Sequence, residues 1–188
     1  MLEGVTIDRK PLKDHLEAVG HRDAFLYVQE LVQNHTPFSE QVIRQIHTLV
    51  LMDRPEDRGI YRRIPVRIMG AFHTPPDPVL VPEQMEQLVA AFAAKSRLHP
   101  IFRAALFHLQ FEGIHPFVDG NGRTGRLILN LMLMQAGYPP INVKYRDRKR
   151  YYEAFDAYYR DQNPGAMLKL VVAELKEQLQ LYAACAVN

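Results

Sequence analysis

The sequence predicts a mostly helical, all-α single domain with one short β element, on three observations. Residues 100–114 and 127–134 are apolar on nearly all sides, as in helices buried within a fold. Most other stretches repeat apolar residues at helical spacing, and only the region around residue 64 alternates as a strand does. A chain of 188 residues fits one domain, residues 1–188, with a core that needs no disulfide.

The expected helices follow one another along the chain. The first runs from Pro11, a residue suited to the first helical turn, to about Val32. The second follows Ser39, a candidate N-cap, and ends near Met52. Prolines or glycines punctuate the remaining helices, which we expect at residues 82–98, 100–114, 127–134, 148–161 and 164–184.

The β element lies between two expected loops, residues 53–60 and 74–79. Ile64, Val66 and Ile68 alternate with polar or small positions, which predicts a strand or a hairpin. Pro65 has no backbone N–H to donate, so this strand can only lie at an edge.

Composition and charge exclude several classes of protein. The chain has 23 Lys and Arg against 21 Asp and Glu, and a net charge of +2 favours neither a nucleic acid nor an anionic membrane as partner. No run approaches the roughly 20 apolar residues of a membrane span, and the N-terminus lacks the apolar stretch of a secretory signal. The lone Cys185 excludes an internal disulfide. We therefore expect a cytoplasmic protein, with other export routes left open.

The most informative segment is HPFVDGNGRTGR, residues 115–126, between the two apolar helices. Gly120, Gly122 and Gly125 match the G-x-G-x-x-G pattern of dinucleotide-binding proteins. That pattern needs a preceding strand and an acidic residue about 20 positions later, whereas here a helix precedes and no acid occurs before Asp147. The same lack of strands argues against a kinase glycine-rich loop.

The glycines of this loop instead favour an anion site. Backbone N–H groups can converge on a bound oxygen where no Cβ blocks the approach, and the N-terminus of the following helix adds positive charge. We place Arg123 and Arg126 in the first turn of that helix, where each exposed cation costs about 0.3–1 kcal/mol. A bound polyphosphate would remove this conflict and accept hydrogen bonds from both guanidinium groups.

Two further side chains of the loop suit phosphate chemistry. Asp119 is a single carboxylate beside the expected phosphates, which is typical of a Mg²⁺ site. The neutral imidazole of His115 could take a proton from an attacking hydroxyl. Each residue alone has ordinary structural roles in capping or packing, but together they predict transfer of a nucleotidyl or phosphoryl group. Phe117 is expected to anchor the loop in the core.

HPFVDGNGR and the arginine three residues later resemble the signature H-x-F-x-[DE]-G-N-G-R-x-x-R of the Fic domain family at every fixed position. PLKDHLEA, VRIMG…PPDP and MQAGYPP are also similar to Fic sequences, so the resemblance extends over most of the chain. It implies a mostly helical Fic fold with a β-hairpin flap. It also implies an enzyme that transfers AMP from ATP to a Ser, Thr or Tyr hydroxyl of a target protein and releases pyrophosphate.

The resemblance assigns roles to the residues of the loop. His115 would be the general base and Asp119 would hold Mg²⁺. The phosphates would bind an anion hole formed by Gly120, Asn121 and Gly122, and the guanidinium groups of Arg123 and Arg126. Some relatives that phosphorylate their targets carry Lys in place of the second glycine, so a glycine here favours AMP transfer.

The resemblance also implies an adenine site and a target-binding flap. Tyr152, beside Tyr151 at the start of a helix, is our candidate for stacking on adenine, and Tyr159 stands where many relatives carry Asn. Thr124 and Gly125 complete the expected nucleotide-binding set. The flap, residues 61–73, would clamp the backbone of the target by strand addition through Val66, Ile68, Met69 and Gly70.

Many Fic proteins carry an inhibitory helix with the pattern [ST]-x-x-x-E-[GN], which has no match here. Thr36 and Glu40 have the spacing, but Gln41 follows, and Glu3–Gly4 resembles only the end of the pattern. We expect the inhibitory helix to lie upstream of Met1, to belong to a separate protein or to be absent, and the chain to be active without release. A homo-oligomer is compatible with the sequence.

Other interpretations stay open. The chain could be a Fic module that binds nucleotide or a partner without turnover, or it could transfer another nucleotidyl group. Residues 123–150 hold seven Lys and Arg against one acid, with tyrosines nearby, a pattern also found in single-strand nucleic-acid binders. The more ordinary explanation is a solvated helix start beside an anionic pocket. Eight histidines without H-E-x-x-H or a cysteine pair do not favour a zinc enzyme.

Overall fold

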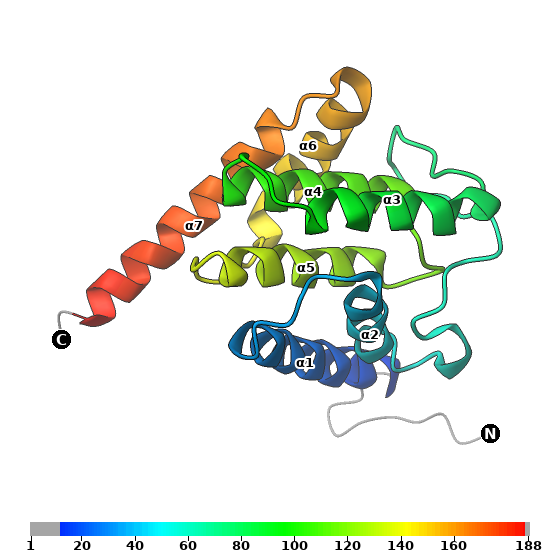
Figure 1. Cartoon of the computed structure of the whole chain (residues 1–188), viewed down its shortest axis with the longest axis horizontal. Helices are drawn as coiled ribbons and strands as arrows, with labels where there is room; N and C mark the ends of the chain where they lie inside the picture. The colour runs from blue at the N-terminus through cyan, green and yellow to red at the C-terminus, as the bar shows by residue number, and fades with distance from the viewer. Residues whose placement is uncertain (1–11, 187–188) are drawn as a thin grey trace.

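A computed structural model of the chain describes residues 12–186, and the secondary structure in this range is helical (Figure 1). The α-helices are α1 (Leu12–Gln33), α2 (Glu40–Val50), α3 (Val81–Ala93), α4 (Pro100–Ile114), α5 (Asn121–Gln135), α6 (Arg148–Asp161) and α7 (Gly165–Ala186). Short 3₁₀ turns are η1 (Pro55–Asp57), η2 (Pro78–Leu80) and η3 (Tyr145–Asp147). The mostly helical prediction is confirmed, while Pro11 and Glu3–Gly4 lie outside the described residues.

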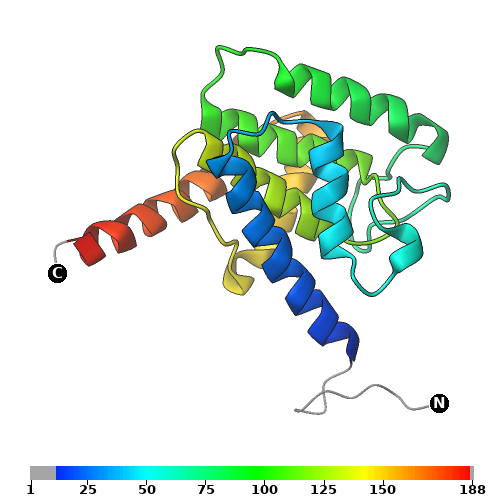
Figure 2. The same cartoon turned by 60° about the horizontal axis from the view of Figure 1, so that its bottom comes forward.

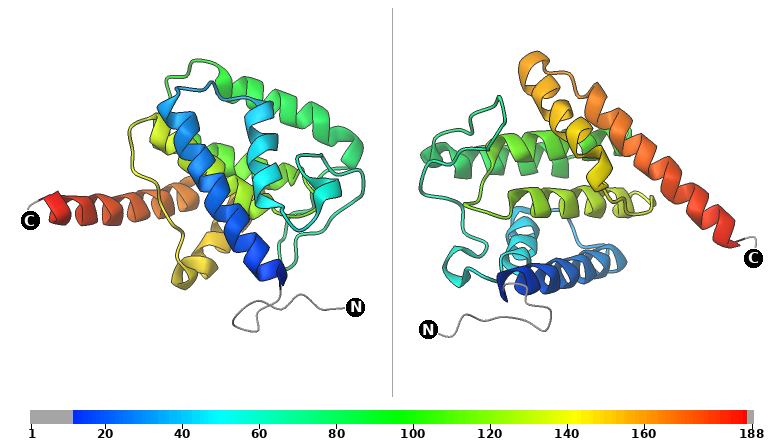
Figure 3. Two further views of the ribbon diagram at one scale, coloured as in Figure 1. Left: turned by 90° about the horizontal axis from the view of Figure 1, so that it is seen from below. Right: turned by 180° about the vertical axis from the view of Figure 1, so that it is seen from behind.

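Helices α4 and α5 lie side by side at the centre of the molecule, as Figures 1 and 3 show from opposite sides. Both were expected to be buried, and both contribute residues to two apolar clusters. Pro100 opens α4 after His99, whose ring nitrogen accepts a hydrogen bond from the Ile101 N–H at 3.3 Å. The α4–α5 pair thus separates two cores and carries the loop of residues 115–120 at one end.

One cluster lies between the α4–α5 pair and helices α1, α2 and α3, and its fully buried side chains include Ile43, Ile46 and Phe107. The other lies between the same pair and helices α6 and α7, and includes Leu109 and Leu129. The last part of α7 extends away from the body of the molecule (Figure 2). Its side chains Leu179, Leu181 and Tyr182 are exposed.

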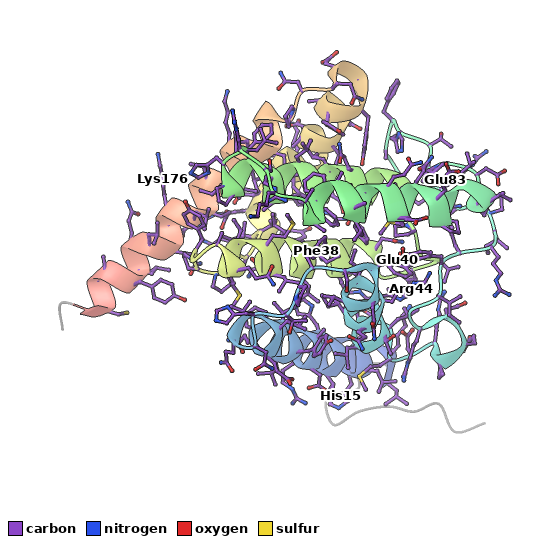
Figure 4. The ribbon with its side chains drawn as sticks, viewed as in Figure 1. His15, Phe38, Glu40, Arg44, Glu83 and Lys176 are labelled. Carbon is purple, nitrogen blue, oxygen red and sulfur yellow. The ribbon has the colours of Figure 1, made fainter. Side chains whose placement is uncertain are left out.

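Helix α2 begins as the sequence predicts. The hydroxyl of Ser39 accepts a hydrogen bond from the Val42 N–H at 3.3 Å, as expected of an N-cap. Glu40 and Arg44 lie one turn apart on the same face of α2 (Figure 4) and form an ion pair of 3.0 Å. This i,i+4 order, with the acid nearer the N-terminus, supports the helix.

Two helix boundaries differ from the prediction. Helix α3 ends at Ala93 rather than near residue 98, because Ser96 closes a local turn by accepting the Leu98 N–H at 3.1 Å. Helix α5 begins at Asn121, six residues before the apolar run that marked it. Arg123 therefore lies in the first turn, as predicted, but Arg126 lies in the second, so its placement in the first turn was wrong.

The predicted β-hairpin of residues 61–73 is not formed, and residues 12–186 contain no strand. The segment is an irregular loop that reverses at Gly70, which has a φ of +77°, and the Ala71 N–H donates to the Ile68 carbonyl at 3.2 Å. An edge strand needs a neighbour, and the described chain offers none, while Pro65 removes a donor. Val66, Ile68, Met69 and Gly70 thus lie on this loop, and Met69 is almost fully exposed.

None of the helices in the described part of the chain combines the length and the apolar character needed to cross a membrane.

Candidate functional site

The loop of residues 115–120 connects the end of α4 to the start of α5, and the residue at each end of it has a left-handed backbone conformation. His115 ends α4 with a φ of +50°, and its N–H still donates to the Phe111 carbonyl at 2.9 Å. Gly120 starts α5 with a φ of +75°, a conformation that costs glycine little. Between them Phe117 is fully buried, so the predicted core anchor is confirmed.

The side chain of Asn121 holds this loop closed. Its oxygen accepts the Phe117 N–H at 2.9 Å and its amide donates to the Phe117 carbonyl at 2.8 Å. The residue is 2% exposed, and both of these hydrogen bonds are buried, so its side chain is fully used in holding the loop. The N–H groups of the first helical turn, including those of Gly122 and Arg123, have no acceptor within α5.

His47 on α2 is a loop-positioning residue that the sequence analysis missed. Its Nε2–H donates to the Asp119 carbonyl at 3.0 Å, because the Gly59 N–H donates to its Nδ1 at 2.9 Å. Its ring stacks on Phe117 with centroids 3.6 Å apart. Burial lowers the pKa of His47 to about 4, so the ring is neutral near pH 7. Its place on the apolar face of α2, with Ile43, Ile46 and Val50, was the available signal.

A cleft of about 210 Å³ opens beside the loop and collects residues from three parts of the chain. Helices α4 and α5 supply His115, Glu112, Gly122 and Arg126. Helix α6 and the loop of residues 61–73 supply the rest of the lining, which is Tyr151, Tyr152, Phe155, Asp156, Tyr159, Ile68, Gly70 and Ala71. The structure therefore brings together the predicted base, one predicted arginine, the predicted tyrosines and part of the predicted flap.

His115 is the imidazole of this cleft, with its side chain 19% exposed. Its Nδ1 lies 3.6 Å from Oε2 of Glu112, one turn earlier on α4. Its carbonyl accepts from Nε of Arg62 at 2.8 Å. Arg62 is 3% exposed and also donates to the carbonyls of Ile64 and Pro76, so it fixes the base of the flap loop to the end of α4. The sequence carried no signal for this buried arginine.

The two arginines of the motif point to different places. Arg126 lines the cleft and two further cavities of about 390 and 400 Å³. Arg123 faces α1 instead, with Nη1 at 3.4 Å from Oε2 of Glu17 and Nη2 at 3.8 Å from Oδ1 of Asp119. These carboxylates neutralise part of the charge of Arg123. The unfavourable placement of a cation at the start of α5, which a polyphosphate was expected to relieve, is thus partly relieved by the protein itself.

The three tyrosines of α6 that were predicted to bind nucleotide differ in their surroundings. Tyr151 is buried, its hydroxyl lies 2.6 Å from Nε2 of His108, and burial raises its pKa. Tyr159 donates to the Leu109 carbonyl at 3.0 Å and stacks on His73, with centroids 4.1 Å apart. Tyr152 is 48% exposed and borders two of the cavities, which leaves its ring the most accessible of the three.

Thr124 and Gly125 face the protein interior rather than the cleft. Thr124 is fully buried. A Cβ on Gly125 would lie 2.4 Å from Oε1 of Glu112 and 3.0 Å from the ring of His108, so glycine is needed for the close approach of α5 to α4. Burial lowers the pKa of His108 to about 4, which keeps this contact uncharged on the histidine side.

Asp119 is 37% exposed and lies at the start of α5. Its Oδ1 accepts the Gly120 N–H at 2.6 Å, and its Oδ2 lies 3.7 Å from the guanidinium of Arg54. Residues 12–186 hold no cluster of three or more His, Cys, Asp or Glu side chains suited to a metal. Asp119 is thus a single, partly exposed carboxylate, and a lone carboxylate is a kind of donor that Mg²⁺ accepts when phosphate and water complete its shell.

Known proteins resemble this chain in sequence and in fold. Curated proteins named "Protein adenylyltransferase Fic" from Nematostella vectensis and Drosophila grimshawi are 38% and 36% identical to it over 153 residues, or 79% of the chain. The chain spans about a third of their length, 35% and 31% respectively. The solved structure of Fic-1 from C. elegans superimposes with a TM-score of 0.86 over 98% of this chain and 56% of that one, at 28% identity.

The sequence model of the Fic/DOC family matches residues 37–133. This range contains α2, the loop of residues 61–73, α3, the whole of α4, α5 nearly to its end, and the whole 115–126 motif. The match covers slightly more than half of the chain, and the chain therefore belongs to the Fic/DOC family.

Proposed function

We propose that this chain transfers AMP from ATP to a hydroxyl of a target protein and releases pyrophosphate. The observation that carries the proposal is the cleft in which His115, the N-terminus of α5 and Arg126 meet. An imidazole, free backbone N–H groups and a guanidinium are the base, the oxyanion donors and the phosphate partner that such a transfer needs. The name of the curated relatives, protein adenylyltransferase, supports the same activity.

In the proposed reaction His115 takes the proton of the target hydroxyl at Nε2. The hydroxyl oxygen forms a bond to the α-phosphorus of ATP, and the bond from that phosphorus to the bridging oxygen breaks, so that pyrophosphate leaves. The N–H groups of Gly122 and its neighbours would stabilise the negative charge that develops on the phosphate oxygens. Arg126 would bind the leaving phosphates, and Tyr152 would stack on adenine.

Asp119 would hold Mg²⁺ through one carboxylate oxygen. When bound, the ion neutralises phosphate charge. The hydrogen bond from the Gly120 N–H to Oδ1 orients this carboxylate, whose side chain is 37% exposed.

The loop of residues 61–73 would receive the target. Its exposed apolar side chains and its backbone at residues 65–68, which belongs to no helix or strand, offer a surface on which a segment of the target can lie. Because Ile68 and Gly70 also line the cleft, a segment held there would present its hydroxyl toward His115. No regulatory partner is needed in this scheme.

Intact-mass spectrometry of the purified chain and candidate targets, with Mg²⁺ and ATP, UTP or GTP in turn, tests the proposal. We expect a gain of one AMP on the chain itself or on a target with ATP. We expect no gain with His115→Ala and an unchanged gain with Glu86→Gln, an exposed residue on α3.

A gain of one phosphate or of another nucleotide would overturn the choice of donor or reaction. Nucleotide binding without any mass gain would favour the non-catalytic module instead.

A further inference from the structure

Glu112 is a buried carboxylate in the cleft, and it lies outside the signature of the motif loop. It is 8% exposed and occupies the last turn of α4, three residues before His115. Buried carboxylates are rare unless they are paired, because burial of an unpaired charge is costly. Its presence beside the proposed base therefore needs a physical explanation.

Three buried polar atoms at this point have no hydrogen-bond partner, namely Nδ1 of His115, Nδ1 of His108 and Oε1 of Glu112. Oε2 of Glu112 lies 3.6 Å from Nδ1 of His115, a separation longer than a hydrogen bond. Catalytic hydrogen bonds are often long without substrate and shorten when it binds. Oε2 of Glu112 and Nδ1 of His115 are thus placed to become partners, while Oε1 lies on the side of His108 and Gly125.

The surroundings of Glu112 restrict where its carboxylate can go. On α4 it faces His108, and on α6 it faces the hydroxyls of Tyr151 and Tyr159 and the carboxylate of Asp156 across the cleft. On α5 the missing Cβ of Gly125 makes room for Oε1, and Arg126 lines the same cleft. No ion pair of 4 Å or less joins the Glu112 and Arg126 side chains, both of which are described.

We propose that Glu112 is a positioning residue for His115, an inference that rests on the proposed function. Its carboxylate accepts a hydrogen bond from Nδ1–H, which fixes the tautomer in which Nε2 carries the lone pair. Because Nδ1 is the buried nitrogen, Nε2 is the one that faces the cleft. The carboxylate then also stabilises the imidazolium that forms when Nε2 takes the proton of the target, by the same principle as the acid of a catalytic triad.

The test compares Glu112→Gln, Glu112→Asp and the surface control Glu86→Gln by steady-state kinetics of AMP transfer. For Glu112→Gln we expect kcat to fall about 10- to 100-fold, as for other residues that orient a catalytic group. We expect KM for ATP to stay within about twofold, since in the proposed reaction Glu112 acts on His115 and is assigned no role in holding the nucleotide. Glu112→Asp keeps the charge one methylene further away and should restore part of kcat, and Glu86→Gln should leave it unchanged.

A second readout does not depend on activity. Ring ¹⁵N chemical shifts of His115 in the unmodified chain should show the Nδ1–H tautomer of the neutral imidazole, and Glu112→Gln should populate the Nε2–H tautomer. If the wild type transfers no AMP, the proposed function fails while this measurement still tests the Glu112–His115 pair. An unchanged tautomer in Glu112→Gln, a kcat equal to that of Glu86→Gln, or a loss confined to ATP affinity would each overturn the proposal, the last in favour of a role through Arg126.

Discussion

Asn121 shows how a residue of a binding motif can act through the backbone. Both of its side-chain hydrogen bonds go to Phe117, and Phe117 is fully buried. The amide thereby sets the width of the turn that leads from His115 into α5. In the proposed function the side chain would support the anion site by shaping the loop, and contact with the phosphates would fall to backbone N–H groups of the first turn of α5.

We predict that Asn121→Ala lowers the free energy of unfolding by about 1–3 kcal/mol, because the N–H and carbonyl of Phe117 would be left buried without partners. Asn121→Asp keeps the acceptor for the Phe117 N–H but loses the donor, so its effect should be intermediate. Urea denaturation measures both, with the exposed Asn34→Ala as control. Equal stability of Asn121→Ala and Asn34→Ala would show that the clamp contributes nothing.

At the scale of single residues, sequence reasoning found the groups whose chemistry is local to the motif. His115, Gly122 and Arg126 line one cleft, as their spacing predicts. His47 and Arg62 could not be found in the same way, since each acts on carbonyls more than 50 positions away in the chain. Such contacts follow from the packing of α2 and of the flap loop, which a one-dimensional pattern does not contain.

At the scale of elements, the end of the flap loop is fastened to α6 and to α4. The Phe72 N–H donates to Oδ1 of Asp156 at 3.3 Å, and the Arg160 guanidinium lies 4.8 Å from the centre of the Phe72 ring. His73 stacks on Tyr159, and its Nε2–H donates to the Gly113 carbonyl at 2.8 Å. Tyr159 therefore stabilises the flap loop, whereas its place in the sequence had suggested a role in nucleotide binding.

We predict that His73→Ala loosens the flap loop without unfolding α6. Loss of the stack and of the bond to Gly113 should speed amide hydrogen exchange at residues 66–72 by about tenfold, which corresponds to a combined loss of roughly 1.4 kcal/mol in local stability. KM for the target should rise while ATP affinity is kept. Tyr159→Phe retains the ring and serves as the matched control. Identical exchange in the two variants would contradict this role for His73.

The helices themselves were largely predictable, because apolar spacing, Ser39 and the prolines mark them in the sequence. Two of the errors have separate causes. The alternation in residues 61–69 describes only which side chains are apolar. A strand also needs a neighbouring strand to pair with, and residues 12–186 contain none. The early start of α5 was hidden by glycines, whose low helix propensity is overcome here by the clamp of Asn121 and the packing of Gly125 against α4.

At the scale of the whole molecule, two buried neutral histidines make the folding stability depend on pH. His47 joins α2 to the motif loop, and His108 joins α4 to α6. Burial lowers the pKa of both to about 4, below the ordinary value of 6.5. Between these values the unfolded chain binds protons that the folded chain does not, so stability falls as the pH falls.

We predict that lowering the pH from 7 to 5 reduces the free energy of unfolding by about 2 kcal/mol for each of these histidines, and that the loss approaches about 3 kcal/mol each near pH 4. Urea denaturation at several pH values measures the total. NMR titration of the two rings assigns it, since both should remain neutral at pH 5. Constant stability between pH 7 and 5, or rings that titrate at their ordinary value, would show that burial does not hold them neutral.

The guanidinium of Arg62 donates hydrogen bonds to the carbonyls of His115, Ile64 and Pro76, and so connects the flap loop to the end of α4. A planar guanidinium keeps its donors at fixed separations, so the loop cannot swing outward as a lid without pulling on the backbone of the imidazole. Under the proposed function, Arg62 would therefore set a fixed distance between a polypeptide docked along the loop and the imidazole of His115. The choice among several hydroxyl residues of one target would then depend more on the number of residues between each hydroxyl and the docked segment than on the flanking sequence.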